Sequence, residues 1–79
     1  MILEIVTTEE VLYSGDVDVV IAPGREGQLG ILPRHAPLLT GIKEGNVVAR
    51  LGSEETSISV NGGFLEVINN KVTILAGSS

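Results

Sequence analysis

The sequence predicts an all-β domain, built as a small sandwich or flattened barrel of mostly antiparallel strands. Short β-branched runs recur between turn signals along the chain, and no stretch of ten or more residues shows a helical period. Several runs alternate apolar with polar residues, as half-buried strands do, because successive side chains point to opposite faces. Roughly eight to ten short strands with close turns favour antiparallel pairing in two packed sheets or one flattened barrel.

The expected strands follow one another with turn signals between them. The runs are residues 2–6, 11–13, 16–22, 29–32, 46–51, 56–60, 64–68 and 71–75. In the third run Val17, Val19 and Ile21 are expected to face the core, and Val47, Ala49 and Leu51 in the fifth. The turns are expected at Ser14-Gly15, Pro23-Gly24, Gly52-Ser53, Asn61-Gly62-Gly63 and Asn69-Asn70.

Length and composition limit the classes of protein to which the chain can belong. The 79 residues predict one domain, residues 1–79, with 43% hydrophobic residues and only two aromatic ones, so the core must be aliphatic. A net charge of -5 repels phosphate backbones and excludes nucleic acid as a partner. The absence of cysteine excludes a disulfide, a thiolate zinc site and a thiol nucleophile. We expect no signal peptide, and no apolar run of about 18 residues occurs in the sequence.

The glycines at 24, 27 and 30 superficially resemble a nucleotide-binding loop. Phosphate-binding loops need a following helix, whose N-terminus faces the anion. Here a strand-like piece and Pro33 follow, and no Gly-Lys-Ser or Gly-Lys-Thr occurs. We therefore expect tight turns in a β loop, and no cofactor.

No other residues form a recognisable catalytic or metal-binding pattern. His35 is the only histidine, without the spaced partners that a metal site needs. Ser14, His35 and Asp16 could in principle form a hydrolytic triad, but no nucleophile motif surrounds any serine. The acid pairs Glu9-Glu10 and Glu54-Glu55 flank turns and are expected in water. The sequence predicts neither enzymatic activity nor a metal site.

The stretch from Gly30 to Leu39 is apolar, rich in proline and centred on His35. One interpretation is an internal crossing between sheets, with Ile31, Leu32 and Leu38 facing the core. The other is a recognition surface, because rigid loops on a β scaffold commonly carry binding. The residues alone do not choose between the two.

Three ordered blocks carry a resemblance to a known family. Residues 27–38 resemble the signature loop of epsilon subunits of the rotary F-type ATP synthase, and residues 14–15 the turn before it. Residues 61–67 resemble the family's second signature, and residues 71–76 its closing strand. The match runs through the whole chain in order and with the right spacings, and it is to the N-terminal β-domain of those subunits.

The resemblance implies a sandwich of two roughly five-stranded sheets in a non-catalytic central-stalk subunit. Such a subunit binds the gamma subunit and the c-ring of the synthase and couples proton transport to ATP synthesis. It implies a place at the cytoplasmic face of the bacterial cell membrane, in preference to a plastid, reached through the complex. Family members usually continue into a C-terminal helical hairpin, which this sequence, ending at Ser79, does not include.

The resemblance also implies two sets of contact residues. The c-ring contact is expected at Glu26, Gly27 and Gln28, and the gamma contact at Thr7, His35 and Thr40. Many bacterial members have a glutamate where this chain has Gln28, so Glu26 must supply any charge that meets the ring.

A small anion- or ligand-binding β-barrel is the alternative function. A lumen would need small or polar residues inside, yet the residues expected to point inward are bulky and would fill it. These residues are Val17, Val19, Ile21, Val47 and Leu51.

Overall fold

Seven strands form one continuous sheet in the computed structural model, which describes residues 1–77. They are β1 (Ile2–Val6), β2 (Val11–Asp16), β3 (Val19–Gly24), β4 (Gly27–Ile31), β5 (Leu38–Leu51), β6 (Glu54–Ile68) and β7 (Lys71–Ala76). The order across the sheet is β2-β1-β7-β6-β5-β3-β4, and only β1 and β7 are parallel. The predicted all-β, mostly antiparallel fold is confirmed; the expected domain end at Ser79 lies outside the described residues.

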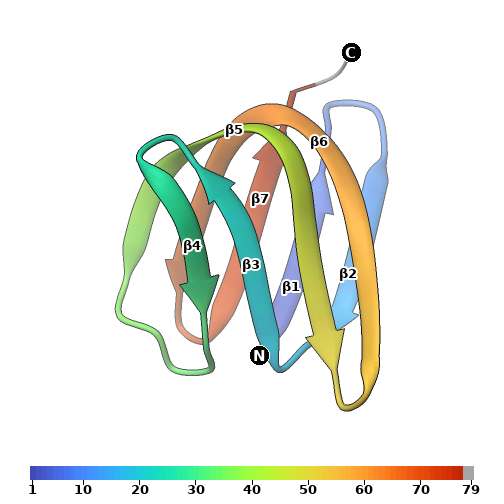
Figure 1. Cartoon of the computed structure of the whole chain (residues 1–79), viewed down its shortest axis with the longest axis vertical. Helices are drawn as coiled ribbons and strands as arrows, with labels where there is room; N and C mark the ends of the chain where they lie inside the picture. The colour runs from blue at the N-terminus through green and yellow to red at the C-terminus, as the bar shows by residue number, and fades with distance from the viewer. Residues whose placement is uncertain (78–79) are drawn as a thin grey trace.

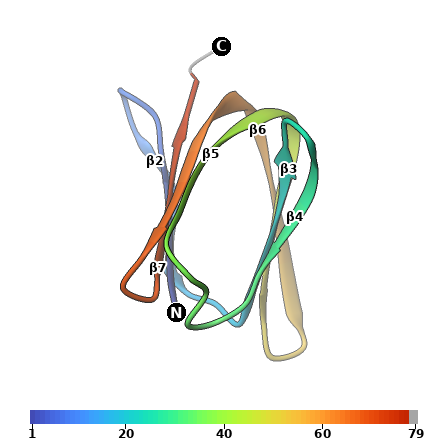
Figure 2. The same cartoon turned by 90° about the vertical axis from the view of Figure 1, so that its left-hand side faces the viewer.

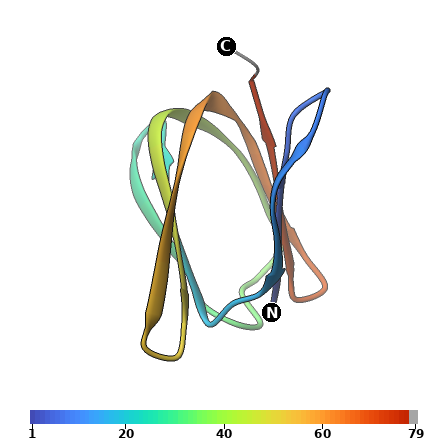
Figure 3. The same ribbon diagram turned by 90° about the vertical axis from the view of Figure 1, so that its right-hand side faces the viewer.

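The sheet is folded over itself into two layers, because β5 and β6 are long and bend together (Figures 1 and 2). Residues 38–42 of β5 pair with residues 63–67 of β6, next to β7, β1 and β2. Residues 45–51 of β5 pair with residues 54–60 of β6, next to β3 and β4. We call the first the five-segment layer and the second the four-segment layer. The two layers lie face to face (Figure 3).

The expected sandwich is therefore present, but its two sheets are halves of one sheet. The turn expected at Asn61-Gly62-Gly63 is wrong, because these residues lie within β6, which bends there without ending. Gly41 and Gly45 lie likewise within β5. Gly62 and Gly63 have positive φ values of 84° and 134°. A Cβ atom on Gly63 would collide with the carbonyl oxygen of Leu75, so β7 approaches the bend as closely as glycine allows.

The space between the layers is filled by aliphatic side chains. No polar or charged residue is buried among the described residues, which confirms the expected core. The largest fully buried side chains are Leu3, Ile5, Val17, Val20, Ile31, Ile42, Val47, Leu65, Val67, Val72 and Ile74.

Three residues expected to face inward do not. Val19 and Ile21 are only partly buried, while Val20 and Ala22 are buried, so the expected phase of this strand is wrong after Val17. The strand begins only at Val19, and the preceding bend, where Val17 N–H donates to the Met1 carbonyl oxygen, reverses the alternation.

Leu51 is the third correction, since it is 46% exposed. It lies at the end of β5, where the predicted Gly52-Ser53 turn extends beyond the core. This turn is confirmed, and the N–H of Gly52 donates to Asp18 Oδ2 at 2.8 Å. The predicted Asn69-Asn70 turn is confirmed too, with φ values of 49° and 60°.

We predict that Gly63→Ala lowers the free energy of unfolding by about 2–4 kcal/mol, because it combines a positive φ with a collision against β7. Gly15→Ala is the matched control, since its Cβ would meet no atom within 4 Å, and should change stability by less than about 0.5 kcal/mol. Urea unfolding measures both; equal midpoints for the two variants would contradict the role of Gly63 in the bend.

Candidate interaction surfaces

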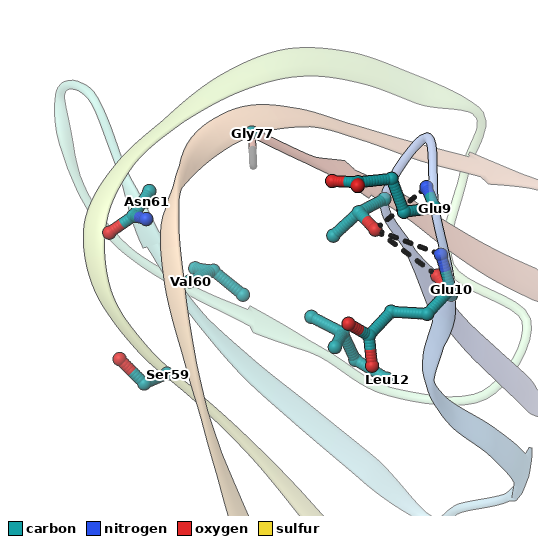
Figure 4. Close-up of a pocket in the computed structure, with 8 residues that line it drawn as sticks. Glu9, Glu10, Leu12, Ser59, Val60, Asn61 and Gly77 are labelled. Carbon is teal, nitrogen blue, oxygen red and sulfur yellow. Dashed lines mark hydrogen bonds between the residues drawn. The ribbon is translucent and has the colours of Figure 1, made fainter. Parts of the chain in front are cut away.

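A hollow lies at one end of the sandwich, between the β1–β2 turn and the bend of β6 (Figure 4). It measures about 210 Å³, and Glu9 and Glu10 are exposed at its rim, as expected for solvated acids. Thr7 Oγ1 accepts from the backbone N–H groups of both glutamates at 3.1 Å, which shapes the turn locally. Within residues 1–77 no three His, Asp or Glu side chains could hold a metal ion together.

The three residues expected to contact the c-ring form the tip of the β3–β4 hairpin. Glu26, Gly27 and Gln28 are all exposed, and Gly27 has a φ of 138°. The turn is tight, because a Cβ atom on Gly24 would collide with the Gly27 carbonyl oxygen. The glycine-rich loop is thus a hairpin followed by a strand, which confirms that it does not have the geometry of a phosphate-binding loop.

An open groove of about 470 Å³ lies next to this tip, on the outer face of the four-segment layer. Ile21, Pro23 and Val48 provide apolar lining, and Gln28 and Lys43 provide polar groups. The groove is shallow and open, so it offers a docking depression for a partner rather than an enclosed ligand site.

The loop from residue 32 to residue 37 connects β4 to β5 and is exposed throughout. Ile31 is buried and Leu38 is partly buried, but Leu32, expected inward under one interpretation, is 60% exposed. Each interpretation therefore holds for a part of the stretch, with Ile31 in the core and the proline loop on the surface.

Two hydrogen bonds hold this loop. The N–H of Arg34, which has a φ of 66°, donates to Asn70 Oδ1 of the β6–β7 turn at 2.9 Å. The N–H of His35 donates to the Leu32 carbonyl oxygen at 3.2 Å. The His35 ring is exposed, with Nδ1 2.7 Å from the Ala36 carbonyl oxygen, and is available to a partner.

The three residues expected to contact gamma do not form one cluster. Thr7 lies in the β1–β2 turn, at the end of the sandwich opposite the β4–β5 loop that carries His35 (Figure 1). Thr40 is partly buried within β5 and stands opposite the buried Leu65, so its side chain points toward the core. Only a partner extending along the domain would reach both Thr7 and His35.

An apolar surface that the sequence reasoning missed crosses the outer face of the five-segment layer. Phe64, Leu75, Val6 and Val11 are successive partners across β6, β7, β1 and β2, and we call them the outer row. Phe64, Leu75 and Val11 are 52%, 51% and 59% exposed. Leu39, in the adjoining row, is 72% exposed. Contiguous exposed apolar side chains mark interaction sites.

A signal for the outer row was present in the sequence. A strand buried on one face alternates, yet apolar neighbours occur as Ile5-Val6, Phe64-Leu65 and Ile74-Leu75. In each pair one residue is buried in the core and the other belongs to the outer row. These doublets indicate a layer with two apolar faces.

The whole chain, residues 1–79, matches the family model of the ATP synthase Delta/Epsilon chain, beta-sandwich domain. The chain belongs to this family. It is 52% identical over 77 residues to the ATP synthase epsilon chain of Dehalococcoides mccartyi, and 51% over 74 residues to that of Chloroflexus aurantiacus. These alignments cover 98% and 94% of this chain but 55% and 53% of the relatives, so the chain spans about half their length.

Solved structures share the fold of this family member. A chain of the Euglena gracilis mitochondrial ATP synthase matches 96% of this chain and 49% of its own length, with a TM-score of 0.89 and 22% identity. A chain of the Tetrahymena thermophila mitochondrial ATP synthase central stalk and c-ring matches 98% and 63%, with a TM-score of 0.80 and 18% identity. The predicted resemblance is confirmed. Residues 1–77 include no helix that could cross a membrane.

Proposed function

We propose that this domain is the N-terminal part of a non-catalytic central-stalk subunit in a rotary, proton-translocating ATP synthase. It binds the gamma subunit and the c-ring and helps to couple proton transport to ATP synthesis. The observation that carries the proposal is the 52% identity to an epsilon chain over nearly the whole domain. The bacterial relatives favour a position at the cytoplasmic face of the cell membrane, held there through the complex.

The outer row supports a role in protein binding. Exposed apolar residues on a thin domain favour burial against a partner, because that removes apolar surface from water. Thr7 lies in the β1–β2 turn, directly after Val6 of the row, so one of the proposed gamma contacts is at the edge of this face. Thr40 points toward the core and would have to contact gamma through its backbone. We place the gamma subunit along the five-segment layer, with His35 at the far end of the contact.

The hairpin tip supports a second, separate contact. Glu26, Gly27 and Gln28 project from the end of the sandwich that also carries the β1–β2 turn (Figure 1). A short, exposed tip with one carboxylate and one amide suits the polar surface of a c-ring, because both groups accept hydrogen bonds. Glu26 has no ion-pair partner within residues 1–77 and is free to meet a cation of the ring.

The alternative, an anion- or ligand-binding barrel, has less support. The buried residues pack into one aliphatic cluster without a buried polar group, so the described part of the interior offers nothing to orient an anion. The open groove beside Gln28 is on the surface, where its lining is as well suited to a protein partner.

Calorimetry with the gamma subunit of a closely related bacterial synthase tests the proposed function. We expect micromolar or tighter affinity, and a loss of about 1–2 kcal/mol for His35→Ala, the usual cost of an interface hydrogen bond. Arg50→Ala is the control, because Arg50 pairs with Glu55 near the β5–β6 turn, away from the proposed contact. Wild-type affinity in His35→Ala would remove His35 from the contact, and no binding of the unaltered chain would contradict the gamma assignment.

The ring contact predicts a charge effect. The test uses vesicles that hold a related synthase, in which this domain replaces the N-terminal domain of the epsilon subunit. Changing both Glu26 and Gln28 to lysine should lower proton-driven ATP synthesis by these vesicles. The two added ammonium groups would repel any basic ring surface, and removing their water at the contact would cost free energy. Glu54→Lys with Glu55→Lys, in the β5–β6 turn region, is the matched control. Unchanged synthesis in the first variant would contradict the ring assignment.

A further inference from the structure

Arg25 reaches from one layer of the sandwich to the other. It is at the corner of the β3–β4 hairpin, next to Glu26, but its side chain lies over Gly41 in the five-segment part of β5. A Cβ atom built on Gly41 would stand 2.6 Å from Nε, 2.8 Å from Cζ and 2.9 Å from Cδ of Arg25. Because Gly41 has no side chain, the Arg25 side chain can occupy the space above it.

Two further contacts hold the same residue. The Arg25 Cζ atom lies 5.6 Å from the centroid of the Phe64 ring, within the range of a cation–π interaction. Phe64 is the direct partner of Gly41 across β5 and β6, so the ring and the vacant space are adjacent. The backbone N–H of Arg25 also donates to the Gly41 carbonyl oxygen at 3.2 Å.

The hairpin needs an attachment at this point. β3 pairs regularly with β5 up to Ile21, the register is irregular between Ile21 and Gly24, and the last strand pair is Gly24 with Ile42, just before the tip. The β4 strand is at the edge of the sheet, and its only partner is β3. Beyond Gly24 the turn has no further strand partner, and a two-stranded ribbon alone is marginally stable in water, so the turn would otherwise have few constraints.

We propose that Arg25 is a positioning residue, which holds the hairpin tip at Glu26–Gln28 in place by lying in the space over Gly41 and against the Phe64 ring. Arg25 thereby ties the tip to Phe64 of the outer row. If the proposed function holds, this contact links the ring-binding tip to the gamma-binding face; the link itself depends only on the geometry of this chain.

Amide hydrogen exchange of the folded domain, followed by NMR at residues 26–28, tests the proposal. Arg25→Ala removes the side chain, Gly41→Ala fills its space, and Phe64→Leu removes the π face while keeping an apolar side chain. Each should raise tip exchange about two- to fivefold, the factor that corresponds to an exposed cation–π contact. Phe64→Tyr keeps a ring and should retain wild-type exchange.

Gly41→Ala is informative, because Gly41 has no positive φ and the three atoms nearest to the added Cβ would all belong to the Arg25 side chain. Combining it with Arg25→Ala should raise tip exchange no further than either change alone, since both break one contact. Arg50→Ala, an exposed arginine near the β5–β6 turn, should leave the tip unchanged. Unchanged tip exchange in Arg25→Ala and Gly41→Ala, or additive effects, would overturn the proposal.

A parallel pull-down with a purified c-ring separates this inference from the proposed function. Faster tip exchange in Arg25→Ala together with weaker capture of the ring supports both. Faster exchange with no ring capture by any variant, the unaltered chain included, supports the positioning role and contradicts the ring contact.

Discussion

The joint bend of β5 and β6 is the constraint on which the rest of the domain depends. Because these two strands belong to both layers, one continuous sheet encloses an aliphatic core without a second sheet. Gly62 and Gly63 make the bend possible, through positive φ and through the close approach of β7. The bend also brings β3 and β5 to the corner where the Arg25 N–H meets the Gly41 carbonyl oxygen, and so it places the hairpin tip.

The arrangement leaves the domain with exposed surfaces suited to protein partners. All buried side chains among residues 1–77 are apolar, so no buried polar group is held ready for a substrate. The polar and apolar features that remain are all on the outside: the hairpin tip, the proline loop with His35, and the outer row. A rigid sandwich presenting preset surfaces lowers the ordering cost of association, which fits a subunit that works through its neighbours.

Local sequence signals predicted a feature correctly where a single residue property decides it. The Gly52-Ser53 and Asn69-Asn70 turns follow from residues that tolerate positive φ, and the aliphatic core follows from composition. The long bent strands were not predictable, because glycine signals a turn and a bend alike. Val19 and Ile21 were misassigned because an irregularity at residues 17–18 shifts the alternation. The Arg25–Gly41 contact joins positions 16 residues apart and depends on the fold, so no local pattern could reveal it.

We propose that this domain docks on the gamma subunit through the outer face of its five-segment layer. Hydrogen–deuterium exchange of the domain, free and bound to the gamma subunit of a related bacterial synthase, tests it most directly. We expect added protection in β1, β2, β7 and the 63–68 part of β6, with no change in the β5–β6 turn at Gly52. Protection confined to the β5–β6 turn or to the four-segment layer would contradict it.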